Sequence, residues 1–174
     1  MKKTLVFAFT AMVAFCISCN SGTTAAENSG HEAEQKNIAA FETVSKAFDT
    51  GETSPIDSVV ADNFVDHSDH GDVVGKDSLK AMITMMHEKF KDMKTERINT
   101  AASGDYVYAW MRYTGTSDGT MGMPSGPYDM KGIELVKFND GKAVEHWAFM
   151  EMQEMMKMMG SQPAMGAMDS TKMK

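Results

Sequence analysis

Residues 126–151 read GPYDMKGIELVKFNDGKAVEHWAFME, and this stretch decides the fold. Bulky and β-branched apolar residues occur in both halves, which predicts two long strands. Asn139–Gly141 lies between them, and its Asp-Gly pair tolerates the positive φ that a tight hairpin turn needs. Glu134 and His146 are polar residues set among the apolar ones, one in each strand. Because strand side chains alternate between faces, these two side chains are either exposed or directed into a pocket.

The chain before this hairpin is rich in helical patterns. Phe41, Val44 and Phe48 recur at helical spacing, and Gly51 ends that pattern. Three helices followed by a run of antiparallel strands predict an α+β domain. In chain order we expect a helix over 33–50, a short helix from 53, a strand and loop over 62–70, a helix over 77–91, strands over 93–102 and 106–115, and, after the hairpin, a helix over 151–159.

The expected strand over 106–115 alternates between two sets of side chains. We assign one set to the core and expect the other set, on the opposite face, to cover a partner subunit. The core set is Val107, Ala109, Met111 and Tyr113, and the opposite set is Tyr108, Trp110 and Arg112.

The only long apolar run of the sequence lies at its N-terminus. Two lysines precede an apolar segment over 5–17, which is typical of a signal peptide and too short for a comfortable transmembrane helix. The segment ends in Cys16–Cys19, which resembles a bacterial lipobox with cleavage before Cys19 and a lipid on its thiol; an ordinary secretory signal is the alternative. We therefore expect a lipid-anchored protein of the bacterial cell envelope, periplasmic or outer-membrane associated. The expected divisions are a lipoprotein signal peptide (1–18), a flexible tether (19–34), the folded domain (35–160) and a disordered Met-containing tail (161–174).

Charge and motif content argue against several functional classes. The formal net charge is −7 and there is no basic run, so we expect no nucleic-acid partner. Both cysteines lie in the N-terminal segment, so the domain has none for an internal disulfide. The sequence contains no P-loop, nucleotide-binding glycine fingerprint or Ser/His/Asp set, so we expect neither a cofactor nor a nucleophilic enzyme.

The hairpin also carries a family resemblance. The run GIELVKFNDGKAVEHW over 132–147 resembles the signature hairpin of SnoaL-like polyketide cyclases, in the nuclear transport factor 2-like superfamily. Other segments match in the same order, so that the resemblance covers about 38–160. It implies a curved antiparallel sheet folded round a conical cavity, with N-terminal helices packed on the sheet, and commonly a homodimer. The other matching segments are DNFVDH (62–67), a helix led by Gly75, the strand over 107–115 and MGMP (121–124).

The same resemblance implies a pocket for a small organic ligand but an altered reactive site. In the cyclases an acid/base aspartate stands two residues after this histidine, where the chain has Ala148, and Glu134 occupies the partner histidine position. Polyketide ring closure is therefore not expected, although Glu134 and His146 can share a proton and serve as a general acid and base. The alternative is a polar pair that only satisfies itself inside an apolar cone. The expected ligand-binding residues are Phe64, His67, Met111, Met121, Met123, Met130 and Met150.

Two features favour a different function, the binding of a metal. Asp66–His70 holds two His and two Asp residues, and two histidines three apart can ligate one ion on a helix. Nine of the 19 methionines lie from Met150 onward, and thioethers are soft ligands that suit Cu(I), although methionine is also a flexible core filler. A metal site of this kind would use His67, His70, Met155 and Met158.

Three hypotheses follow. The first is an exported, lipid-anchored domain that binds a small organic ligand in its cavity, with Glu134 and His146 orienting a polar group and with or without acid–base activity of an isomerase or cyclase kind. The second is a periplasmic copper-binding protein that uses the C-terminal methionines. The third is a non-catalytic dimerisation or interaction module.

Overall fold

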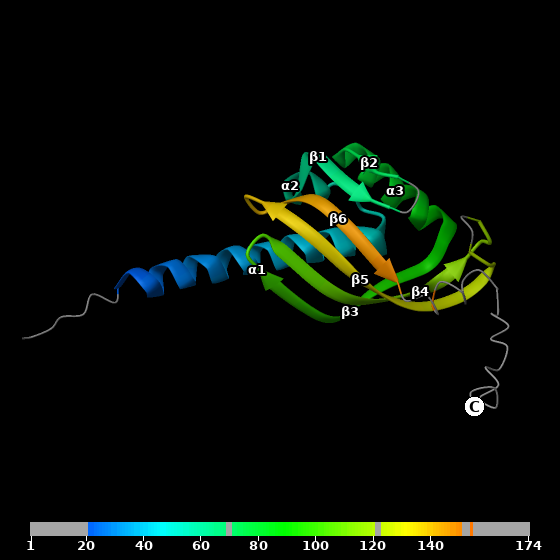
Figure 1. Cartoon of the computed structure of the whole chain (residues 1–174). Helices are drawn as coiled ribbons and strands as arrows, with labels where there is room; N and C mark the ends of the chain where they lie inside the picture. The colour runs from blue at the N-terminus through cyan, green and yellow to red at the C-terminus, as the bar shows by residue number, and fades with distance from the viewer. Residues whose placement is uncertain (1–20, 69–70, 121–122, 151–153, 155–174) are drawn as a thin grey trace, which may run out of the picture.

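Two helices, two strands, a third helix and four further strands follow one another along the chain (Figure 1). The computed structural model describes residues 21–68, 71–120, 123–150 and 154. The elements are α1 (Ser21–Thr50), α2 (Ile56–Val59), β1 (Val60–His67), β2 (Val73–Val74), α3 (Lys76–Lys89), β3 (Phe90–Ser103), β4 (Tyr106–Ser117), β5 (Gly126–Asn139) and β6 (Lys142–Met150).

The predicted hairpin lies in the middle of the sheet. Strands β5 and β6 pair antiparallel, and Asn139 faces Lys142 across the turn. Asp140 and Gly141 have φ angles of 51° and 74°, in the left-handed region. Glycine adopts this region without steric cost and aspartate tolerates it, so the two strands and the turn between them are confirmed.

The six strands form one curved sheet in the order β2-β1-β6-β5-β4-β3. Strands β3 to β6 pair antiparallel with their neighbours, whereas β1 lies parallel to β6. The expectation of an antiparallel sheet is therefore corrected to a mixed one. Sequence patterns indicate hairpins between neighbouring segments, but they do not indicate that an early strand will pair with the last one.

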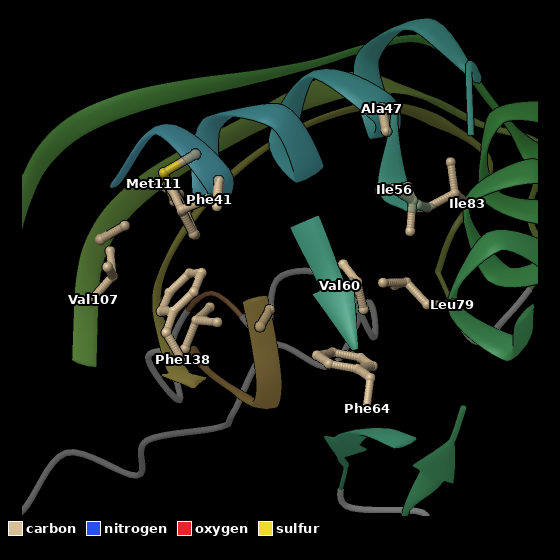
Figure 2. Packing of buried hydrophobic residues seen from close by; sticks show 14 residues of the cluster. Phe41, Ala47, Ile56, Val60, Phe64, Leu79, Ile83, Val107, Met111 and Phe138 are labelled. Atoms are coloured by element: carbon tan, nitrogen blue, oxygen red, sulfur yellow. The ribbon is translucent and has the colours of Figure 1, made fainter. Parts of the chain in front are cut away.

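The helices pack on one face of the sheet and enclose the core. Buried side chains from α1, α2, α3 and the inner face of the strands form a single apolar cluster, shown in Figure 2. Each large side chain of this kind contributes roughly 1.5–3 kcal/mol when it is fully buried. The α+β class, with N-terminal helices on a curved sheet, is confirmed. The largest fully buried side chains are Phe138, Ile56, Ile83, Val60 and Val107.

Helix α1 begins earlier than the sequence predicts. It starts at Ser21, whereas the expected start was Ala33 with a flexible tether before it. Residues 29–33 are exposed, and Figure 1 shows the first turns extending past the edge of the sheet. The segment contains alanine and glutamate, which favour helix, and the packed turns that follow supply a nucleus from which the helix can extend. Of the helices that the structure describes, none is both long enough and apolar enough to span a membrane.

Strand β4 shows the predicted alternation. Val107, Ala109 and Met111 are buried in the core, whereas Tyr108 and Trp110 are exposed on the opposite face. The remaining expectations for the chain ends lie outside the described residues: the signal peptide, Cys19, the tail over 161–174 and, apart from the helical residue Glu154, the closing helix over 151–159.

Candidate functional site

A cavity of about 270 Å³ lies between the helices and the inner face of the sheet. Most of its wall is apolar, and its two carboxylates and its histidine come from the neighbouring strands β1, β5 and β6. An apolar chamber with a few convergent polar groups is the usual form of a small-molecule site. Its apolar and thioether wall includes Phe41, Phe48, Phe64, Met82, Met86, Met93, Met111, Met130, Val136, Phe138 and Met150.

Four of the polar side chains form one hydrogen-bonded network, which we call the inner network: Tyr113, Glu134, His146 and Asp66. The parallel register places Asp66 beside His146, and His146 Nδ1 lies 2.7 Å from Asp66 Oδ1. On its other side, His146 Nε2 contacts Glu134 Oε2, and the Tyr113 hydroxyl donates to Glu134 Oε1. Each of these residues lies on the inner face because strand side chains alternate.

The geometry of the inner network favours a doubly protonated His146. Both ring nitrogens face carboxylate oxygens, and towards two ionised carboxylates only the imidazolium donates from both nitrogens. Burial alone would lower the pKa of His146, but its hydrogen bonds to Asp66 and Glu134 outweigh that effect and raise the pKa to about 10. Burial, followed by the charge of Glu134, raises the pKa of Tyr113 well above its ordinary value, so its hydroxyl stays protonated.

A second histidine cluster, the outer network, lies on the opposite face of β1 and β6. His67 Nδ1 is 2.9 Å from Asp72 Oδ1, and His67 Nε2 is 3.2 Å from Glu145 Oε2. Lys137 Nζ also donates to Glu145 at 2.7 Å. The His67 ring stacks on Trp147 with centroids 4.7 Å apart, and its hydrogen bond to Asp72 is the main cause of a raised pKa.

The structure brings most of the predicted site residues to the cavity. Glu134 and His146 line it together, as do Phe64, Met111, Met130 and Met150, and their contact with a ligand stays a prediction. His67 was expected at the cavity but lies in the outer network, because Asp66 takes the inward position and its neighbour in the strand must face outward. Met123 is not part of the wall, and Met121 lies outside the described residues.

Sequence reasoning missed two members of the inner network, Asp66 and Tyr113. Asp66 stands in the His/Asp-rich segment, from which the sequence analysis selects its neighbour His67 for the pocket, and Tyr113 is expected on the core face without a polar role. The alternation of side chains along the strand was the signal that could have located Asp66. It places Asp66 and His67 on opposite faces, so choosing Asp66 as the inward residue would have put it with Glu134 and His146.

The metal hypothesis gains no site in the described part of the chain. There, no group of three or more His, Cys, Asp or Glu residues is arranged to hold an ion. His70, Met155 and Met158 lie outside the described residues, so the copper alternative stays a prediction.

Comparisons with known proteins give a family and a fold. A family model described as SnoaL-like polyketide cyclase matches residues 38–159. A protein from Jannaschia sp. CCS1 described as a SnoaL-like polyketide cyclase is 21% identical, with a TM-score of 0.64 over 75% of this chain and 96% of that one. A protein from Streptomyces galilaeus described as a hydroxylase is 26% identical, with a TM-score of 0.61 over 75% and 84%.

The fold is shared with other chemistries as well. An epoxide hydrolase from M. tuberculosis is 12% identical and superposes with a TM-score of 0.60, over 72% of this chain and 90% of that one. No curated protein matches the sequence. Structures with this fold carry names of several reaction types, so the fold by itself does not assign a reaction and the side chains of the cavity must.

Proposed function

The chain belongs to the SnoaL-like polyketide cyclase family, and from this premise we propose that it binds a small, largely apolar organic molecule in its cavity and moves a proton on that molecule. One observation carries the proposal: the inner network of four hydrogen-bonded acid–base groups stands at the polar end of an otherwise apolar chamber. Groups with strongly shifted pKa values gather at functional sites more often than elsewhere.

The reaction we propose is not polyketide ring closure. The position of the cyclase aspartate is Ala148, which cannot take up a proton, and it lies directly opposite Glu134 in the β5–β6 register. The carboxylates at the cavity are instead Glu134 on β5 and Asp66 on β1. Their different position supports a proton transfer of the isomerase kind, in which one group removes a proton and returns it elsewhere on the same molecule.

Asp66 is the proposed base. One of its carboxylate oxygens accepts from His146, whereas no hydrogen bond is found for Oδ2 among the described residues. In contrast, Glu134 is engaged through both oxygens. The proposed step transfers a proton from an acidic C–H of the ligand to Asp66 Oδ2. The electron pair of that bond remains on the ligand as an enolate, which the His146 imidazolium stabilises through its positive charge.

Solvent exchange tests the proposed step without knowledge of the natural ligand. The full chain is incubated in D₂O with 2-tetralone, an apolar bicyclic ketone with acidic C–H groups, and deuterium uptake is followed by mass spectrometry. We expect exchange faster than with buffer alone, and a loss of roughly 100-fold or more in Asp66→Asn. The matched control is Asp72→Asn, which removes the carboxylate beside the other histidine. Equal exchange in Asp66→Asn and the wild type would refute the role of Asp66.

We also propose that the domain forms a homodimer through the outer face of the sheet. Tyr108, Trp110 and Ile133 are exposed by 44%, 45% and 42% on neighbouring strands, and Trp110 pairs directly with Ile133. Such a patch is larger than the scattered apolar residues of an ordinary surface. Sedimentation of Trp110→Asp should give a monomer, whereas Val74→Asp, which changes an exposed apolar residue elsewhere, should leave the dimer intact. A monomeric wild type would end this proposal.

Export and lipid anchoring are proposed from the N-terminal sequence alone. The lipobox-like segment before Cys19 supports a lipid on that cysteine and a location in the bacterial cell envelope. In a bacterial host fed radiolabelled palmitate, the wild-type chain should take up label and sediment with membranes, and Cys19→Ser should do neither. Label retained by Cys19→Ser would show that the lipid is elsewhere.

A further inference from the structure

The polar end of the cavity carries an unbalanced negative charge. His146 donates to Asp66 and Glu134 at the same time, so one positive charge stands between two negative ones and the sum is −1. Tyr113 donates its proton in a hydrogen bond and adds no charge. Among the described residues, neither lysine nor arginine lines the cavity.

This charge is largely removed from solvent. The exposed fractions of the side chains are 13% for Asp66, 16% for Glu134 and 22% for His146. A charge in apolar surroundings is costly unless an opposite charge or a hydrogen-bond donor approaches it. Asp66 Oδ2 is the place for such a group, because the other oxygen of that carboxylate is already occupied by His146. A molecule that enters the cavity therefore meets a carboxylate oxygen to which none of the described side chains donates.

The remaining wall suits a cation with an apolar body. The rings of Phe41, Phe64 and Phe138 line the same chamber, and aromatic faces attract cations. An anion would add to the existing charge of −1 and would find no cationic side chain in the described wall. A cavity of about 150 Å³ in another protein holds benzene, so about 270 Å³ accommodates a bicyclic skeleton.

We infer that the ligands of this cavity are apolar amines, whose protonated nitrogen lies against Asp66 and whose hydrocarbon part fills the aromatic and thioether chamber. The inference rests on the proposed function in that it concerns the same cavity, and it adds the chemical class of the occupant. It also states what the site rejects, because carboxylates and phosphates of the same shape are excluded.

Three tetralin derivatives of similar shape and different charge test this inference. The full chain is titrated calorimetrically with 2-aminotetralin, 2-hydroxytetralin and tetralin-2-carboxylate, which are a cation, a neutral molecule and an anion near neutral pH. We expect the amine to bind at least tenfold more tightly than the alcohol and the carboxylate to show no binding. In Asp66→Asn the preference for the amine over the alcohol should fall to less than threefold. Asp72→Asn keeps Asp66 and should retain the full preference.

The outcomes separate this inference from the proposed reaction. Binding of the carboxylate as tight as that of the amine, or tighter, overturns the inference. An amine preference that survives in Asp66→Asn also overturns it, because the preference would then arise from the general negative charge of the protein. Preference for the amine with no exchange on 2-tetralone supports the inference and removes only the proton-transfer step. Exchange on 2-tetralone without amine preference leaves the reaction standing and refutes the ligand class.

Discussion

Strands β1 and β6 carry two histidine networks, one on each face, and their comparison shows what burial adds to the same side chains. In the inner network His146 lies between Asp66 and Glu134, and in the outer network His67 lies between Asp72 and Glu145. The residues are sequence neighbours, since Asp66 precedes His67 and Glu145 precedes His146. Strand alternation sends Asp66 and His146 inward and their neighbours His67 and Glu145 outward.

The two networks differ in charge balance as well as in exposure. Lys137 donates to Glu145 and brings a positive charge to the outer network, whereas none of the described lysines and arginines lines the chamber beside the inner network, which keeps a charge of −1. Water screens the outer charges, and the inner ones face an apolar chamber. We therefore expect the same substitution to have a large effect on one face and a small effect on the other.

Removing the histidine should give the largest contrast. His146→Ala leaves Asp66 and Glu134 close together without a cation, and breaking a buried charge network of this kind typically costs about 3–5 kcal/mol of unfolding free energy. The unfolding free energy of His67→Ala should stay much nearer to that of the wild type, because water can hydrate Asp72 and Glu145 in place of the imidazole. Urea unfolding measures both. Similar losses in the two variants would show that burial does not distinguish the networks.

The next largest difference between the two networks should be in the pH dependence of the unfolding free energy. The pKa of histidine is about 6.5 in an unfolded chain and that of His146 is about 10 in the folded protein, so the folded state holds its proton more tightly. The resulting stabilisation is complete below about pH 6.5 and is lost as the pH rises towards about 10. The groups facing His146 are Asp66 and Glu134, and Tyr113 faces Glu134.

Urea unfolding of the wild type at pH 7 and pH 9.5 should therefore show a fall in stability that His146→Gln lacks. His67→Gln is the matched variant and should keep most of the wild-type fall. Imidazole NMR provides a direct check, because His146 should still carry both ring protons at pH 8. A single ring proton at that pH would contradict the assigned charge of the inner network.

The smallest contrast concerns the outermost hydrogen bond of each network. Tyr113→Phe removes the donor to Glu134 Oε1 and should cost about 1–3 kcal/mol, because a buried carboxylate oxygen is left without a partner. Lys137→Met removes the matching donor to Glu145 on the outer face and should change stability less, since water takes its place. Thermal unfolding of both variants measures the difference, and a larger loss in Lys137→Met would reverse the comparison.

Local patterns predicted what depends on local rules. The turn at Asp140-Gly141, the two faces of β4 and the common direction of Glu134 and His146 follow from turn chemistry and from alternation. The inward direction of Asp66 follows from alternation with Phe64, but its place beside His146 depends on β1 lying parallel to β6, a pairing between distant parts of the chain that no local pattern indicates. His67 was wrongly expected in the cavity, because it has the opposite parity to Phe64 and cannot share a face of β1 with it.

Tyr113 and the start of α1 were missed for different reasons. Tyr113 has the parity of a core residue, and its hydroxyl gains a role only because Glu134 comes from the neighbouring strand. The first turns of α1 have little apolar periodicity, so the pattern that located the packed part of the helix could not locate its beginning.

The parallel pairing of β1 with β6 also has a consequence for the order in which the protein acquires its site. Asp66 and His146 are 80 residues apart, so the inner network is absent until the last strand has been synthesised and has joined the sheet. Contacts of such long sequence separation form late, because closing the intervening loop is slow. Until β6 joins the sheet the chamber therefore lacks part of its wall, and the arrival of β6 links β1 to β5 and brings Asp66, His146 and Glu134 together in one event.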